Sequence, residues 1–505
     1  MAVDLLPVYP GEAVGVGELP RFVWGKLREA ICSRVGRGAR LAALCGRPVD
    51  GDLELLAVLL EPGEGVLALG SAVVADRFPS LTTECPQAHW FERELAEQWG
   101  VVPEGHPWLK PIRFHRSYRE HHDAWGRSPG DPILPSVTDF YRVDGEEVHE
   151  VAVGPVHAGV IEPGHFRFQC HGENVLHLEI SLGYQHRGVE RAFLRGPSNR
   201  LIHLAETLAG DTSVGHATAY CQAVEALASS VVPPRADAIR AVALELERLA
   251  NHVGDLGALA GDVGFLPTQS FCGRLRGDIL NLTALLCGSR FGRGIVRPGG
   301  VGFDLEPDRV GTLGERLAAA LGDVREAVEL MAESPSLQAR FEGTGTLSRE
   351  QAVSLGLVGP AARACGLEHD VRAELPTGMY RFAHIPVSTW HTGDVFGRAW
   401  VRWLEVQRSA AFIKEQLAAL PAGACRVPCG PLAADHLAVT LTEGWRGELC
   451  HVLRTDAGGA LMQVKVVDPS FHNWMGLAMA LRNEQISDFP LCNKSFNLSY
   501  CGHDL

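Results

Sequence analysis

The side chains in this sequence with the most reactive chemistry are its 13 cysteines, which could bind a metal. None of them forms a Cys-x-x-Cys pair, the spacing that thiolate-bound metal sites usually take. Cys425 and Cys429 lie four residues apart with Pro428 between them, and no second pair or histidine follows at zinc-finger spacing. We therefore expect structural cysteines at these positions, with a metal site as the alternative.

The C-terminal tail holds a second group of side chains that could bind a metal. Cys492 and Cys501 are nine residues apart, which is the wrong spacing for a chelating pair, and His503 and Asp504 follow them. Together with the distant His216 these side chains could form a zinc site, because cysteine, histidine and aspartate suit zinc. The loose spacing favours the alternative, in which they are packing residues.

The composition is that of a globular protein and excludes some functions. The 505 residues are 46% apolar and 21% charged, which suggests about two to four domains with large cores. A net charge of -14 provides no basic surplus to neutralise phosphates, so we expect no nucleic-acid partner. We find no secretory signal and no apolar run long enough to cross a membrane. We therefore expect a cytoplasmic protein with reduced cysteines, attached to the inner face of the cell membrane through partners.

The elements at the start of the chain mix helix and strand. Residues 20–46 have a helical and then a strand-like pattern. Two apolar runs, 53–60 and 66–74, flank the turn sequence Glu-Pro-Gly-Glu-Gly and predict a hairpin. Residues 88–99 predict a helix that ends at Gly100.

A change in composition marks a domain boundary. Residues 113–144 are rich in His, Arg, Pro, Gly and Asp and have no steady periodicity, which is typical of a linker. We predict a small α+β domain at 1–125, a linker at 126–150 and a second domain at 151–505.

The second predicted domain contains three long stretches with apolar residues at helical spacing. The three sets are Ile239, Val242, Leu246, Leu249 and Val253; Leu313, Leu317, Leu321, Val324, Val328 and Met331; and Trp403, Val406, Ala410, Ile413, Leu417 and Leu420. Such stripes mark buried helix faces, so we predict a β-sheet followed by a central antiparallel helical bundle. Residues 448–454 and 461–467 predict paired strands, followed by a helix and an irregular tail. The predicted fold class is α+β.

The first predicted domain resembles the C-type (30-kDa) subunit of respiratory complex I. The matching motifs are Phe78-Pro79-Ser80-Leu81-Thr82, Trp90-Phe91-Glu92-Arg93-Glu94, Trp99-Gly100 and Gly105-His106-Pro107. Glu92, Arg93 and Glu94 could form ion pairs across a subunit interface, with neighbouring tryptophans as apolar anchors. The alternative is an amphipathic helix with one face in solvent.

The second predicted domain resembles the large subunit of membrane-bound nickel–iron hydrogenases and the D-type (49-kDa) subunit of complex I. Residues 154–190, GPVHAGVIEPGHFRFQCHGENVLHLEISLGYQHRGVE, match the family's opening. Later matches, in the family's order, are Arg297-Pro298-Gly299-Gly300, Gly359-Pro360, Asp370-Val371-Arg372, Gly393-Asp394 with Arg398, and Asp468-Pro469-Ser470-Phe471. The resemblance identifies a hydrogenase-3/4-type large subunit that fuses C-type and D-type parts.

The resemblance also shows which metal ligands this chain lacks. Hydrogenase relatives hold nickel with two Cys-x-x-Cys pairs, because soft thiolates support its low-valent states. Here the first pair would fall at Ala209 and Thr212, and neither can bind nickel as a thiolate. The second would lie in the tail, where Cys492 and Cys501 have the wrong spacing. The resemblance therefore implies no nickel–iron centre, no metal bound by this chain, and no working hydrogenase on its own.

In complex I relatives a histidine and a tyrosine bind the quinone headgroup. His157 matches the histidine, which could donate to a quinone carbonyl and deliver a proton, and Gly210 stands at the tyrosine position. Asp211, Thr212 or Ser213 could substitute as polar groups. The alternative is that His157 only caps a strand turn.

The resemblance implies that His157, the loop before the later histidine and the tail converge on one cleft. The expected cleft residues are Asp211, Thr212, Ser213, His216, Cys492 and Cys501. The motif His186-Arg187-Gly188-Val189-Glu190 resembles the family's His-Arg-Gly-x-Glu helix start. We expect His186, Arg187 and Glu190 to brace the cleft, with Arg187 and Glu190 as an internal ion pair.

Two functions fit these features. In the first, the chain is a peripheral-arm oxidoreductase subunit beside a B-type-like iron–sulfur small subunit. It binds no cofactor itself, the iron–sulfur cluster belongs to the partner, and its cleft could take a quinone. Electron transfer would drive ion translocation in antiporter-like and other integral membrane subunits. The resemblance also implies quinone binding and NAD binding. The alternative is a non-catalytic coupling or scaffold subunit with a vestigial site, which Ala209 and Gly210 favour.

Overall fold

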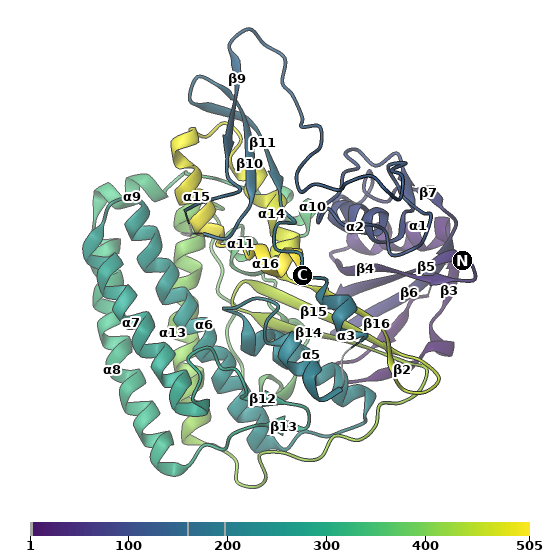
Figure 1. The fold of residues 1–505 in the computed structure, drawn as a ribbon. Coiled ribbons are helices and arrows are strands. Elements are labelled where there is room, and N and C mark those ends of the chain that lie inside the picture. Colours follow the sequence, from purple (N-terminus) through teal and green to yellow (C-terminus); the bar gives the residue numbers. More distant parts are fainter. Residues whose placement is uncertain (1–3, 159–160, 196–197) are drawn as a thin grey trace.

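A computed structural model describes residues 4–158, 161–195 and 198–505 of the chain (Figure 1). The N-terminal part is a sheet in the order β1 (Leu6–Val8), β6 (Val66–Val74), β5 (Asp52–Glu61) and β4 (Arg40–Val49), with β3 (Arg21–Val23) parallel to β6. Strands β5 and β6 confirm the predicted hairpin. Helices α1 (Trp24–Val35) and α2 (His89–Trp99) cover one face of this sheet. A Cβ at Gly70 would meet Leu27 of α1, and a Cβ at Gly46 would meet Leu95 of α2.

The other face of this sheet packs on the C-terminal half of the chain. Arg40 forms an ion pair with Glu448 at 2.8 Å, and Arg454 forms one with Glu54 at 2.8 Å. Both partners in the C-terminal half belong to strand β15 (Gly447–Thr455). Because both faces are covered, β5 is buried from Leu53 to Leu60, and its residues do not alternate between polar and apolar.

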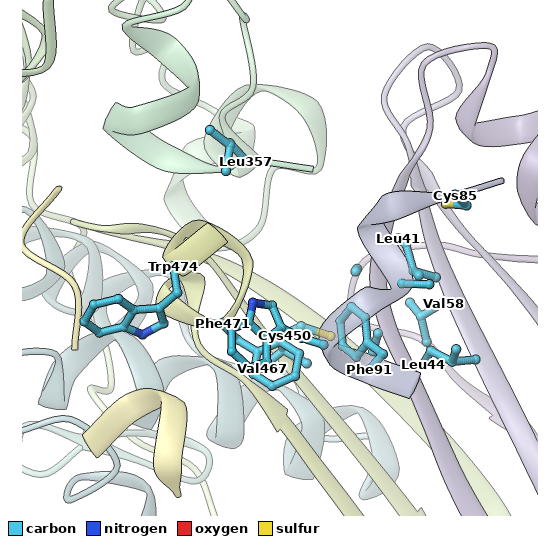
Figure 2. Close-up of a cluster of buried hydrophobic side chains, with 14 of the residues drawn as sticks. Leu41, Leu44, Val58, Cys85, Phe91, Leu357, Cys450, Val467, Phe471 and Trp474 are labelled. Atoms are coloured by element: carbon cyan, nitrogen blue, oxygen red, sulfur yellow. The ribbon is translucent and has the colours of Figure 1, made fainter. Parts of the chain in front are cut away.

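Helix α2 has no exposed residue, so the alternative of a solvated face is wrong, and so is the prediction that Glu92 and Glu94 form ion pairs across a subunit interface. The Phe91 ring is 5.0 Å from the Phe471 ring of α14 (Pro469–Ala480), and Figure 2 shows both rings in one buried cluster. Glu92 is fully buried and accepts hydrogen bonds from the backbone and hydroxyl of Thr82. Glu94, also buried, pairs with Lys465 at 2.6 Å. Glu94 therefore joins two parts of one chain, whereas Glu92 is satisfied within the N-terminal part.

A long irregular segment connects the N-terminal part to a small sheet. Strands β7 (Arg77–Pro79) and β8 (Val102–Glu104) pair, and the residues from 105 to 147 form turns and loops. Strand β9 (Val148–Val153) begins inside the predicted linker, 126–150. It pairs with β10 (His165–His171), which pairs with β11 (Asn174–Ser181), and this sheet projects from the body in Figure 1.

The predicted central helical bundle is confirmed. Its long helices are α5 (Ser213–Leu227), α6 (Pro234–Asp262), α7 (Leu266–Cys287), α8 (Pro307–Ala332) and α13 (Val395–Ala418). The three predicted stripes lie on α6, α8 and α13, except that Leu420 follows the end of α13. The shorter elements around the bundle are α3 (Val189–Phe193), α4 (Leu201–Ala205), β12 (Val296–Arg297), β13 (Gly300–Val301), α9 (Pro335–Phe341), α10 (Arg349–Leu355), α11 (Gly359–Arg363) and α12 (Val371–Glu374). Among the described residues, no helix is long and apolar enough to cross a bilayer.

The C-terminal half adds a second large sheet and a helical tail. The sheet order is β16 (Leu461–Val467), β15, β14 (His436–Gly444) and β2 (Ala13–Gly15), so an N-terminal strand completes a C-terminal sheet. Strands β15 and β16 confirm the predicted pair. The prediction of an irregular tail is wrong, because α15 (Phe489–Phe496) and α16 (Tyr500–Asp504) follow α14. The tail is ordered because Cys492 and His503 are fully buried and Ser499 caps α16.

Candidate functional site

Three segments that are distant in sequence meet at helix α16. Glu162, between β9 and β10, accepts hydrogen bonds from the backbone N–H groups of Tyr500 at 3.1 Å and Cys501 at 3.3 Å. Arg187 joins the loop before α5 to the tail, because its guanidinium donates to the carbonyls of Leu208 at 2.9 Å and Cys501 at 3.4 Å. We term Glu162, residues 209–212 and residues 499–502 the tail junction. The structure thus brings Cys501 and the loop before α5 together.

His157 lies beside the tail junction and supports the turn that leads to it. Its Nε2 is 2.9 Å from the carbonyl oxygen of Gly164, and since a carbonyl can only accept, Nε2 donates. Gly164 packs on the tail, because a Cβ there would lie 2.5 Å from the Tyr500 ring. The half-buried imidazole therefore has only Nδ1 left for a ligand.

Asp211 and Thr212 tie the loop before α5 to the second sheet. Arg446 donates to both carboxylate oxygens of Asp211, at 2.6 and 2.7 Å, and its guanidinium lies 3.9 Å over the Trp445 ring. The Trp445 indole donates to the Thr212 hydroxyl at 3.1 Å. Burial would raise the pKa of Asp211, but Arg446 outweighs burial and holds that pKa below its usual value. Asp211 is therefore an anion clamped by Arg446.

His216 belongs to a buried chain of three titratable side chains, which we term the histidine relay: His451, His216 and Asp468. His216 Nε2 is 3.1 Å from an Asp468 oxygen, and its Nδ1 is 3.1 Å from His451 Nε2. Burial, reinforced by His216, lowers the pKa of His451 well below its usual value, so His451 is neutral. His216 Nε2 therefore donates to Asp468, and His216 Nδ1 and His451 Nε2 share one hydrogen bond, while His451 Nδ1 has no partner among the described residues.

The relay ends directly beneath the tail junction. A Cβ on Gly502 would lie 2.6 Å from the Asp468 carboxyl group, so tail and carboxylate are in contact. Burial would raise the pKa of Asp468, but the hydrogen bond from His216 helps to hold it below its usual value. Ser213, the remaining predicted residue of this loop, is buried and donates to the carbonyl of Glu206 at 2.9 Å.

The cysteines do not gather at one place. Cys492 lies in α15 with its sulfur 3.9 Å from Arg398, whereas Cys501 lies at the tail junction. Burial raises the pKa of each thiol to about 12, so both are protonated at neutral pH. Cys429, which contacts Ser230 at 3.4 Å, is half-buried. Within the described ranges, no three His, Cys, Asp or Glu side chains are grouped to hold a metal ion.

The bracing motif contacts the tail, but its expected ion pair does not form. Arg187 donates to the carbonyls of Thr207 and Leu208, and Glu190 pairs with Lys465 at 3.1 Å. The reason is that α3 begins at Val189, so Arg187 and Glu190 do not share a helix face. His186 Nδ1 is 2.7 Å from the carbonyl of Asp504 and holds the end of the tail.

Several residues of the site were missed by the sequence analysis. Glu162 lies within the opening motif, where its acidic side chain was the available signal, and Asp468 begins the Asp-Pro-Ser-Phe motif. His451 and Arg446 occur in and before a buried strand without any motif, so only the structure reveals their contacts.

Comparison with known proteins gives a consistent result. Residues 262–432 match the family described as respiratory-chain NADH dehydrogenase, 49 Kd subunit, and residues 39–129 match the 30 Kd subunit family. The chain is 33% identical to the carbon monoxide-induced hydrogenase of Rhodospirillum rubrum over 354 residues, which cover 69% of this chain and 97% of that protein.

Two further relatives belong to other kinds of complex. Formate hydrogenlyase subunit 5 of Escherichia coli is 30% identical over 439 residues, covering 84% of this chain and 76% of the relative. NADH-quinone oxidoreductase subunit 4 of Thermus thermophilus is 34% identical over 369 residues, covering 68% and 90%. The chain therefore belongs to the family of the 49-kDa subunit of respiratory-chain NADH dehydrogenase and its hydrogenase relatives, joined to a 30-kDa-type module.

Proposed function

We propose that this chain is the acceptor-side subunit of a membrane-associated oxidoreductase complex, with the tail junction as one wall of the cleft. An iron–sulfur small subunit covers that wall and carries the cluster, and a quinone or another acceptor binds beside it. Electron transfer there drives ion translocation in antiporter-like membrane subunits, which hold the chain at the inner face of the membrane. The family membership and the names of the relatives support this proposal.

The observation that carries the proposal is the histidine relay beneath the tail junction. Reduction of a quinone to a quinol takes up two electrons and two protons, so the cleft needs a route for protons. In the tautomer with a proton on His451 Nε2, that proton can pass to His216 as Nδ1 of His451 takes up another. His216 then passes its own Nε2 proton to Asp468, from which it can reach an acceptor at the tail junction. His157, with Nδ1 free of hydrogen bonds to described residues, is positioned to act nearer the acceptor.

The proposal includes the absence of a nickel–iron centre. Ala209 and Thr212 stand at two positions where hydrogenases have nickel-binding cysteines. The Cys492 and Cys501 thiols are protonated and lie in different places. Elemental analysis of the purified complex tests this point. Stoichiometric nickel that follows this chain through purification would contradict it.

A second candidate function is a coupling or scaffold subunit with a vestigial cleft. It is favoured by how fully the cleft residues are engaged: Asp211 is clamped by Arg446, and one nitrogen of His157 is bound to a backbone carbonyl. In this case the complex uses the chain only to hold its partners or to transmit movement between them.

Substitutions of His157 in the assembled complex separate the two functions. His157→Ala removes both the proton donor and the brace, whereas His157→Gln can still donate to Gly164 but cannot transfer a proton. If His157 is a general acid, both variants lose acceptor-dependent turnover by about 10²–10⁴-fold. Cys492→Ser and Cys501→Ser should retain turnover. Full activity in both His157 variants would refute the redox role and support the scaffold.

A further inference from the structure

A cavity separate from the tail junction lies where α2 meets β11 and α14. Its volume is about 560 Å³, which is within the range of small-molecule sites, and no residue of the tail junction lines it. The wall is mainly aromatic and aliphatic. Its apolar side chains include Trp90, Trp108, Tyr141, Trp474, Met475 and Ala478. Such a wall binds the apolar body of a ligand.

Arg93 brings a fixed positive charge to this cavity. Its guanidinium lies 4.4 Å over the Trp90 ring and donates to the carbonyls of Lys110 and Pro111, each at 2.9 Å. These bonds use Nε and Nη2. Nη1 donates to no described residue and is not enclosed by the protein. Since Arg93 lines the cavity, one donor of its rigid fork remains available there.

This arginine differs from Arg113 and Arg446 because no carboxylate contacts it directly, and Glu179 and Glu97 act on its charge only from a longer distance. Arg113 pairs with Glu94, and Arg446 pairs with Asp211. Among the residues that the structure describes, none offers a carboxylate oxygen within 4 Å of Arg93. Burying a cation beside apolar walls is costly without a counter-ion, so this position is prepared for an anion.

The acidic side chain in the cavity wall is already occupied. Glu179 accepts hydrogen bonds from the Lys110 ammonium, from the Trp108 indole at 3.0 Å and from the Tyr141 backbone at 2.8 Å. Lys110 and Glu179 neutralise each other. The pair therefore leaves Arg93 without a carboxylate in direct contact.

The histidines of the cavity wall add no charge at neutral pH. Burial lowers the pKa of His89 to about 3 and that of His106 to about 4. Burial also lowers the pKa of His177. With the pair at Glu179 neutral, the cavity carries one net positive charge, that of Arg93.

We propose that this cavity binds an amphipathic monoanion, whose carboxylate pairs with Nη1 of Arg93 and whose apolar body fills the aromatic cavity. The chemistry of recognition is a charge-assisted hydrogen bond at one end and burial of apolar surface along the rest. A single carboxylate satisfies the one guanidinium without a direct partner, whereas a dianion would leave a buried negative charge. Alkyl and aryl monocarboxylates are the ligand class that fits.

Isothermal titration of the full chain with decanoate and with decanol, below micelle-forming concentrations, tests the proposal. The wild type should bind decanoate saturably and more tightly than decanol. Arg93→Gln should weaken decanoate about 10- to 100-fold, since the bond to a charged group is lost, and leave decanol unchanged. Arg93→Lys should retain part of the preference. Arg316→Gln, an exposed arginine on α8, is the matched control and should change neither ligand.

A variant that fills the cavity provides an independent test. Ala478→Phe should abolish binding of both ligands, and thermal melts establish that each variant is folded. If Arg93→Gln fails to fold, Arg93→Lys and Ala478→Phe carry the test. The proposal is overturned if decanoate binds no better than decanol, if Arg93→Gln and wild type bind it equally, or if no saturable binding occurs.

Discussion

The substitution Phe91→Ala tests whether the N-terminal module and the C-terminal half share one core. Phe91 is 1% exposed and packs on Phe471 from the other end of the chain (Figure 2). An aromatic side chain buries about 150–250 Å². At about 25 cal/mol per Å² this gives an upper limit of about 4–6 kcal/mol, and measured Phe→Ala changes cost about 3–5 kcal/mol. We expect a loss of about 4 kcal/mol in the free energy of unfolding.

Urea denaturation combined with hydrogen–deuterium exchange measures this loss and its location. Because the core is shared, exchange should rise both in β5 and in α14, and their unfolding transitions should shift together. Phe382→Ala, at a side chain that is 77% exposed, should change stability by less than about 0.5 kcal/mol. Faster exchange in β5 without faster exchange in α14 would refute the shared core and indicate two independent units.

Three further predictions concern the site and its surroundings. Asp211→Asn should cost about 3 kcal/mol in chemical denaturation, because it leaves the charge of Arg446 buried without a partner; a change below about 0.5 kcal/mol would contradict the clamp. Burial lowers the pKa of His472 to about 4, so the unfolded chain binds the proton first and stability falls as pH drops from about 6.5 to about 4. His472→Leu should flatten the slope of unfolding free energy against pH by up to about 1.4 kcal/mol per pH unit. A variant with the same stability profile against pH as the wild type would refute this role of His472. Glu162→Ala should lower the free energy of unfolding by about 1 kcal/mol and speed hydrogen exchange in α16. Exchange in α16 as slow as in the wild type would show that Glu162 does not hold the tail.

Regular periodicity made much of the fold predictable from sequence. The stripes on α6, α8 and α13 repeat over several turns, and the Glu-Pro-Gly-Glu-Gly turn separates two apolar runs, so bundle and hairpin follow from local patterns. Helix α7 was not identified, although Cys272, Leu275, Ile279, Leu282 and Leu286 form its buried face. Its cysteine and intervening glycines made the stripe harder to recognise.

The failures share a physical cause, which is that sequence shows side chains but not the distant residues that they pair with or pack against. Helix α2 looked like a surface helix because Glu92 and Glu94 are ionisable, yet both are satisfied inside the chain. The tail looked irregular because its helices are short, and their stability comes from packing. In the site, Arg446 and His451 lie more than 200 residues from Asp211 and His216, so no local pattern could pair them.

The pairing of β2 with β14 has a consequence for how the protein is made. Ala13–Gly15 leaves the ribosome early, but its partner Ala438–His436 is synthesised more than 400 residues later. Until then the N-terminal strand has an unpaired edge, and the face of the first sheet that receives β15 stays uncovered. The nascent chain therefore needs protection from aggregation through most of its synthesis, and closure of this sheet marks the moment when a complete subunit can join its partners.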